Sequence, residues 1–193
     1  MASPTGCWPA RRSGPRPRRL PPRRCDASVD LTSLNAVPGE IARQRLLVCC
    51  SSERWAAEVA SGRPYASAEE LLASSDAATA GLAPADLEQA LAGHPRIGER
   101  RGTDERSRRE QAGVLAADQA TIQALAEGNE EYERRFGHIY LVCATGRNAA
   151  DLLALLRERL GNDPEAEWGV VRCELGNINR IRLTRLLEGD GGE

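Results

Sequence analysis

From Leu34 onward the sequence repeats one pattern: a helix-capping residue, a run with apolar side chains at helical spacing, and then a glycine. Serine, asparagine and proline favour the start of a helix, and glycine favours the position just past its end. Residue ranges closed in this way are 52–62, 67–81, 84–93 and 148–161. Alternating runs of β-branched residues, which would indicate strands, are few. The pattern predicts an all-α protein, a bundle of about seven to nine helices.

Further helices are predicted where apolar side chains recur at helical spacing but the capping residue or the final glycine is less clear. These ranges are 38–50, 107–126, 129–136 and 164–187. Gly128 is expected to end one of them and Asn129 to cap the next. Leu, Ala, Val and Ile supply the core, because aromatic residues make up only 4% of the chain.

The chain of 193 residues suits a single domain, but its charge is unevenly divided. Residues 1–25 hold seven arginines and no acid, whereas the remainder carries 19 arginines against 28 acidic residues. Prolines interrupt the early arginines and oppose helix formation. We therefore expect a disordered Arg/Pro-rich extension over residues 1–30, a helical domain over 31–188 and a flexible tail over 189–193.

An arginine-rich leader without acids has two functional interpretations, a nucleic-acid-binding arm and a transit peptide. Neither fits well, because no apolar run of signal-peptide length follows and the prolines disrupt an amphipathic helix. A dispensable extension is the expectation, with neither nucleic acid nor a membrane as partner. No stretch approaches the roughly 18 apolar residues of a membrane-spanning helix.

The six cysteines show no Cys-x-x-Cys motif and no zinc-site spacing with histidine. We interpret them as reduced thiols of a cytoplasmic protein. The two histidines form no ligand pattern, which argues against a metal site. The chain has no lysine for a Schiff base and no glycine-rich phosphate loop, so amine-covalent and nucleotide chemistry are excluded.

His94 is the first candidate for catalysis. It follows the predicted helix over 84–92, and Pro95 prevents that helix from continuing. The partial negative charge at a helix C-terminus favours an imidazolium, so we expect His94 to rest protonated near neutral pH. The competing interpretation is a surface or packing histidine.

Ser107 and Glu110 have the Ser-x-x-Glu spacing of a capping box, which predicts that a helix begins there. The unpaired N–H groups of such a helix start favour an anion. Taken alone, both residues are better explained as capping residues than as site residues.

Two later features bear on a site. The apolar run Ile139–Cys143 lacks helical period, which indicates a buried extended segment or the start of a buried helix; plain core is the simplest explanation. In the last helix, the apolar stripe that ends at Ile178 continues onto Arg182. An inward guanidinium needs an anionic partner or water, unless its head reaches solvent at the edge of the stripe.

Four separated blocks, HPRIGER, SRREQAG, YERRFG and ATGRN, occur in this order from His94 to Asn148. Together they resemble the 2-oxo-4-hydroxy-4-carboxy-5-ureidoimidazoline (OHCU) decarboxylase family, over about residues 34–187. The resemblance implies a cofactor-free carboxy-lyase that forms (S)-allantoin in the last step of urate degradation in purine catabolism. It also implies a homodimer.

The resemblance assigns site residues to positions of this sequence. The catalytic residues would be His94, Glu110 and Arg182. The substrate-binding residues would be Pro95, Ser107, Arg108, Arg109, Gln111, Tyr140, Leu141, Val142, Cys143 and Ala144. His138 is expected to be a variable position beside the pocket, and no residue is assigned to a metal.

A rival interpretation is an inactive helical interaction module whose basic arm binds nucleic acid. Loss of activity would be expected to remove His94, Glu110 or Arg182, and all three are present. The decarboxylase hypothesis therefore requires these three side chains to converge on one small cavity.

Overall fold

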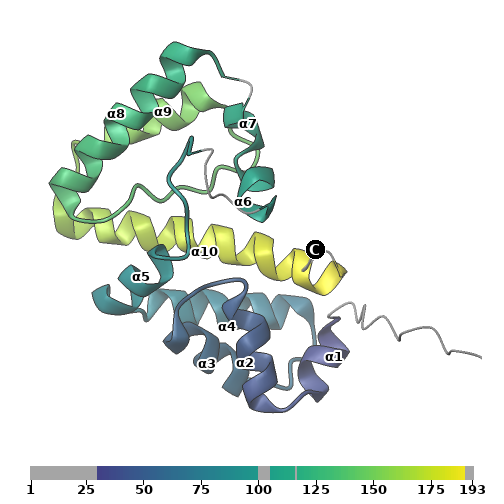
Figure 1. The fold of residues 1–193 in the computed structure, drawn as a ribbon. Coiled ribbons are helices and arrows are strands. Elements are labelled where there is room, and N and C mark those ends of the chain that lie inside the picture. The colour runs from purple at the N-terminus through teal and green to yellow at the C-terminus, as the bar shows by residue number, and fades with distance from the viewer. Residues whose placement is uncertain (1–29, 100–104, 116, 190–193) are drawn as a thin grey trace, which may run out of the picture.

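The computed structural model describes residues 30–99, 105–115 and 117–189 (Figure 1). Within these ranges the protein has ten helices and no strand, which confirms the all-α prediction. The helices are α1 (Leu31–Ala36), α2 (Gly39–Leu47), α3 (Glu53–Ser61), α4 (Ala68–Ala80), α5 (Pro84–Leu91), α6 (Glu105–Glu110), α7 (Ala112–Leu115), α8 (Gln119–Phe136), α9 (Ala149–Arg159) and α10 (Pro164–Glu188). The predicted extension over 1–29 and the end of the tail, 190–193, lie outside the described residues.

The predicted caps are present where the capping residue acts on the helix that starts directly after it. The hydroxyl of Ser52 accepts the N–H of Trp55 at the start of α3, and the hydroxyl of Ser67 accepts the N–H of Glu70 at the start of α4. Asn148 caps α9 by accepting the N–H of Asp151 at 2.9 Å. These bonds satisfy N–H groups that a helix start leaves unpaired, so the boundaries follow from the residues themselves.

Helix α10 organises the molecule. It passes between α1–α5 on one side and α6–α9 on the other (Figure 1). A first apolar cluster joins α1–α5 to the inner face of α10, and a second joins α7, α8 and α9. The stripe predicted for α10 is buried at Val171, Leu175 and Ile178 and ends on a buried Arg182. None of the helices in the described ranges combines the length and apolarity needed to cross a bilayer.

The prediction that Ser107 caps a helix is wrong. Helix α6 begins at Glu105, so Ser107 lies inside it and is buried. The predicted continuous helix over 107–126 is also wrong, because it is divided into α6, α7 and the start of α8. Asp118 makes the last break, since its carboxylate accepts the N–H of Thr121 and starts α8 anew.

The predicted break at Gly128 and Asn129 is wrong for a different reason, because α8 runs through both residues. A Cβ atom at Gly128 would lie 2.6 Å from the Cδ2 atom of Leu156, so the glycine allows α9 to pack closely. The side chain of Asn129 is buried, and its amide donates to the carbonyl of Ile97 at 2.9 Å. Both residues serve packing between elements rather than helix ends.

The run Ile139–Cys143 lies in a segment that is neither helix nor strand and connects α8 to α9. Its side chains alternate between the two apolar clusters: Leu141 and Cys143 join the first, whereas Tyr140, Val142 and Ala144 join the second. Alternation of this kind is typical of an extended main chain. The prediction of a buried extended segment is therefore confirmed.

Candidate active site

One cavity lies where the loop after α5, helix α6, the segment 140–145 and helix α10 meet. It has an empty volume of about 420 Å³, counting its opening to solvent. Its walls are formed by His94, Pro95, Ile97, Ser107, Glu110, Gln111, Tyr140, Leu141, Val142, Ala144, Thr145, Ile178 and Ile181. Elements distant in sequence thus contribute to a single site.

His94 lies just past the end of α5, as predicted, and its backbone N–H donates to the carbonyl of Leu91. Its ring atom Nδ1 lies 2.9 Å from the carbonyl oxygen of Ala90. A carbonyl oxygen can only accept, so Nδ1 carries the proton. The other ring nitrogen, Nε2, is shielded from solvent and has no partner among the described residues.

The expectation that His94 rests protonated is wrong. Burial and the nearby guanidinium of Arg182 lower the pKa of His94 from 6.5 to about 4. The carbonyl of Ala90 and the carboxylate of Glu110 oppose this change but do not outweigh it. His94 is therefore neutral at physiological pH, and Nε2 has a free lone pair on a side chain that lines the cavity.

Arg182 and Glu110 form a bidentate ion pair. The Nε and Nη2 atoms of Arg182 lie 2.8 Å from the two carboxylate oxygens of Glu110, and Nη1 donates to the carbonyl of Cys49 at 2.9 Å. Only 3% of the Arg182 side chain is exposed. The prediction that an inward guanidinium needs an anionic partner is confirmed.

The carboxylate of Glu110 is held by arginine side chains rather than by the imidazole of His94. Both carboxylate oxygens are engaged by Arg182, and Arg185 lies 4.0 Å from one of them. Among the hydrogen bonds of the described residues, none joins Glu110 to His94. Glu110 acts on His94 electrostatically instead, by raising its pKa against the effect of Arg182.

Gln111 links the two sides of the cavity entrance. Its Oε1 atom accepts the N–H of Gly98 at 2.9 Å, and its Nε2 atom donates to the carbonyl of Arg96 at 3.3 Å. The loop that follows His94 is thereby fixed to the end of α6. Ser107 and Pro95 also line the cavity, as expected.

Three of the expected substrate-binding residues do not form the cavity wall. Arg108 and Arg109 are exposed on α6, on a different side from buried Ser107. Cys143 is buried, but its N–H donates to Glu174 at 2.7 Å. Arg182 itself stands behind Glu110 rather than in the wall. In contrast, Tyr140, Leu141, Val142 and Ala144 do line the cavity.

Sequence reasoning missed four wall residues, namely Ile97, Thr145, Ile178 and Ile181. Ile178 belongs to the predicted stripe of α10, so the periodicity identified it as core without identifying it as site. Ile97 lies within the HPRIGER block. Thr145 likewise lies within the ATGRN block, whereas Ile181 carries no signal beyond its neighbours. In the part of the chain that the structure describes, no group of three His, Cys, Asp or Glu residues is arranged to hold a metal ion.

The family model for OHCU decarboxylase matches residues 35–184. The chain is 31% identical over 154 residues to the uric acid degradation bifunctional protein TTL of Arabidopsis thaliana, covering 76% of this chain but only 48% of that protein. It is 32% identical over 139 residues to the 2-oxo-4-hydroxy-4-carboxy-5-ureidoimidazoline decarboxylase of Amia calva, covering 69% and 79% of the two chains.

A crystal structure of an OHCU decarboxylase in the presence of (S)-allantoin is also similar. It has a TM-score of 0.67 and 27% sequence identity, and the match covers 79% of this chain and 99% of that one. The matched range includes His94 and Glu110, which line the cavity, and Arg182, which pairs with Glu110 behind the wall. The chain therefore belongs to the OHCU decarboxylase family.

Proposed function

We propose that this protein decarboxylates OHCU to (S)-allantoin, the last step of urate degradation, without a metal or an organic cofactor. The observation that carries the proposal is a neutral histidine whose Nε2 atom has no hydrogen-bond partner among the described residues. It lies on a cavity wall that also holds the carboxylate of a buried Glu110–Arg182 pair. Family membership supports the reaction class, and the geometry supports the roles that we propose for the residues.

The substrate is chemically suited to a protein without an electron sink. One ring carbon carries both the carboxylate and a hydroxyl, next to an unsaturated carbon that carries the ureido group. When the bond to the carboxylate breaks, carbon dioxide leaves without the electron pair of that bond. The pair forms a double bond between these two carbons, while the ring nitrogen takes up a proton from water. The resulting enol becomes allantoin by losing the hydroxyl proton and gaining a proton on the ureido-bearing carbon.

His94 is the proposed general base and acid of this sequence. Because Nε2 is unprotonated at rest, it can accept the hydroxyl proton of the substrate. The imidazolium so formed can return a proton to the neighbouring carbon. Delivery from one fixed side chain reaches only one face of the ring, which makes the product a single enantiomer.

Arg182 and Glu110 are proposed to set the charge at the site. Arg182 already uses Nε and Nη2 on Glu110 and Nη1 on Cys49, so it acts on the substrate mainly through its positive charge. That charge offsets the negative charge of the Glu110 carboxylate in the cavity wall, which would otherwise repel an anionic substrate. Ser107, Gln111 and the main chain from Tyr140 to Ala144 are proposed to bind the amide groups of the ring and the ureido arm. We retain Arg108 and Arg109 only as candidates for substrate entry, because both lie exposed on α6.

The test is enantioselective product formation by the purified chain after dialysis against a metal chelator. OHCU is generated enzymatically from urate, the protein is added, and circular dichroism follows optically active allantoin. The proposal predicts that dichroism appears well before the spontaneous reaction, which gives racemic allantoin, is complete. A signal identical to the reaction without protein would contradict the proposal.

We further propose a cytoplasmic homodimer. The support for a reducing compartment is that Cys49, Cys50, Cys143 and Cys173 are free thiols. The dimer rests on resemblance to the family alone, and analytical ultracentrifugation tests it: a monomer at micromolar concentration would contradict it.

A further inference from the structure

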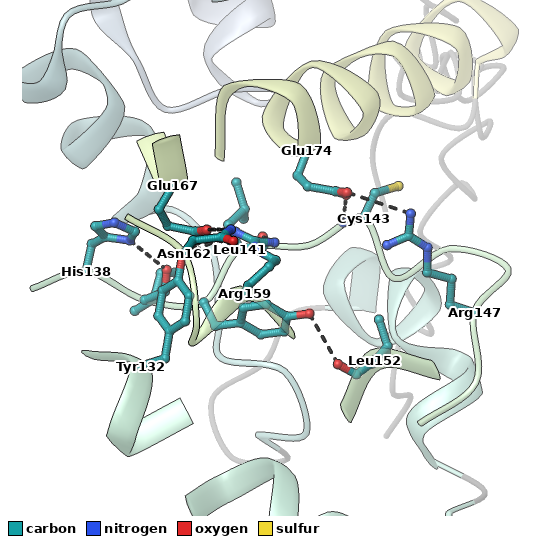
Figure 2. Close-up of polar contacts among 12 residues, drawn as sticks. Tyr132, His138, Leu141, Cys143, Arg147, Leu152, Arg159, Asn162, Glu167 and Glu174 are labelled. Carbon is teal, nitrogen blue, oxygen red and sulfur yellow. Dashed lines mark hydrogen bonds and ion pairs between the residues drawn. The ribbon is translucent and has the colours of Figure 1, made fainter. Parts of the chain in front are cut away.

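The segment 140–144 is buried without the hydrogen-bond ladder of a sheet, so its polar main-chain groups need other partners. Two side chains provide them, Arg159 from α9 and Glu174 from α10 (Figure 2). The carbonyl of Leu141 accepts from Nη1 of Arg159 at 2.7 Å, and the N–H of Cys143 donates to Oε2 of Glu174 at 2.7 Å. The segment is thus anchored at two alternate residues.

Val142 lies between these anchors and differs from its neighbours. In an extended main chain, the N–H and C=O groups of successive residues point to opposite sides. Since Leu141 and Cys143 turn theirs toward Arg159 and Glu174, Val142 turns its own the other way. Within the described residues neither its N–H nor its C=O has a hydrogen-bond partner, and Val142 lines the cavity. An adjacent donor and acceptor are the pair that an amide group of a ring can bind.

Glu174 can fix the position of the segment 140–144 relative to the rest of the site. It lies one helical turn before Ile178 and two turns before Arg182 on α10, so one rigid element carries both the anchor and the guanidinium. Its other carboxylate oxygen, Oε1, lies 3.7 Å from Nη2 of Arg147, and 15% of its side chain is exposed. Arg147 follows directly on the turn that ends the segment.

Arg159 anchors the segment 140–144 in a different way from Glu174. It is buried with Glu167 and Tyr132 in one network, in which its Nη2 atom lies 2.6 Å from Glu167 and 3.2 Å from the Tyr132 hydroxyl (Figure 2). Removing Arg159 would leave the Glu167 carboxylate buried and unpaired, which threatens the fold itself. Glu174 touches the segment at the edge of the core, so its role can be separated from folding.

We propose that Glu174, held by Arg147, is a positioning residue that fixes the Cys143 amide so that the peptide groups of Val142 face the cavity and bind the amide groups of the substrate. This inference rests on the proposed function for the identity of the ligand. Glu174 does not touch the substrate. It acts through the main chain of the segment.

The experiment compares Glu174→Ala with Glu174→Gln and with a control, Glu188→Ala, at an exposed carboxylate near the end of the same helix. Glutamine keeps an oxygen that can accept the Cys143 N–H, whereas alanine does not. We expect Glu174→Ala to lower kcat/KM by about 10- to 100-fold, mostly through a higher KM, because the substrate loses a contact made in both ground and transition states. Glu174→Gln should recover most of this loss, and Glu188→Ala should match the unmodified chain.

Hydrogen–deuterium exchange of the peptide that spans 139–145 provides a readout that does not depend on activity. Glu174→Ala should increase exchange in this peptide, with thermal unfolding close to that of the control and little change in Glu174→Gln. Equal exchange in Glu174→Ala and the control would overturn the inference. So would increased exchange with unchanged KM. An unmodified chain that forms no (S)-allantoin would instead overturn the proposed function, and the exchange data would still decide whether Glu174 anchors the segment.

Discussion

At the scale of single residues, the site depends on the protonation of His94. Its Nδ1–H group donates to Ala90, while burial and the charge of Arg182 keep Nε2 unprotonated. A neutral imidazole suits a reaction whose base must first accept the hydroxyl proton of the substrate. Because the pKa of His94 is lowered in the folded protein, the stability of the protein depends on pH, and this can be measured without substrate.

The stability of the protein should fall between pH 6.5 and pH 4 because of His94. In this range the unfolded chain binds a proton at this histidine and the folded chain does not, since the folded pKa is lowered from 6.5 to about 4. Stability therefore rises with pH through the window, by on the order of 1 to 3 kcal/mol from this residue. Urea unfolding at several pH values, compared with His94→Asn, measures it. Parallel pH dependence in the two proteins would show that the pKa of His94 is not lowered.

The sequence allowed the position of His94 to be predicted but not its charge. Helix-end signals around residues 84–95 are local, so they placed the imidazole past a helix C-terminus. The charge is decided by Arg182, which approaches from the last helix, and by burial within the assembled fold. Likewise, periodicity predicted an inward Arg182, but its partner Glu110 lies 72 residues away and was suggested only by resemblance.

At the scale of elements, local start and stop signals predicted α3, α4, α5 and α9, and apolar periodicity predicted α10, whereas α6–α8 were divided wrongly. Ser52, Ser67 and Asn148 act on their own helix starts, so their effect is readable from neighbouring residues. Gly128 and Asn129 instead make contacts with α9 and with the loop at Ile97. The same residue types that end helices also permit close packing, and only the tertiary structure distinguishes the two uses.

Gly113 in α7 provides a test at this scale. A Cβ atom there would overlap the main-chain carbonyl of Arg147, so α7 and the turn after the segment 140–144 touch backbone to backbone. Because main chain cannot move aside cheaply, Gly113→Ala should destabilise the protein by about 1–3 kcal/mol and reduce kcat/KM.

Gly176→Ala is the matched control, since a Cβ atom at Gly176 of α10 meets nothing within 4 Å. It should be neutral or stabilise the protein by up to about 1 kcal/mol, because alanine favours a helix interior. Chemical denaturation measures both variants. Similar stability of Gly113→Ala and Gly176→Ala would contradict the close approach of α7 to the turn.

At the scale of the whole molecule, α10 joins the core to the cavity. It completes the first apolar cluster, and it carries Ile178 and Ile181 in the cavity wall and Arg182 behind it. The residues of the cavity wall all follow residue 90, and the family model begins at residue 35. The apolar clusters and the cavity wall of the described ranges are thus formed by residues that follow residue 30.

Removal of residues 1–29 should leave kcat/KM for allantoin formation within about twofold of the full chain, since the described cavity wall is formed by residues from His94 onward and chain termini tolerate truncation well. Electrophoretic mobility with duplex DNA, run on both proteins, addresses the rival interpretation of a nucleic-acid-binding arm. A large loss of activity on truncation, or DNA binding lost with the segment, would contradict a dispensable extension.

The most direct test of a histidine-dependent decarboxylase is the initial rate of (S)-allantoin formation by His94→Asn at pH 7, followed by circular dichroism. Asparagine keeps a polar side chain but cannot transfer a proton at this pH. The rate should fall by about 10² to 10⁴ relative to the unmodified chain, while circular dichroism in the far ultraviolet shows the helices intact. A folded His94→Asn protein that forms (S)-allantoin at the unmodified rate would contradict the account.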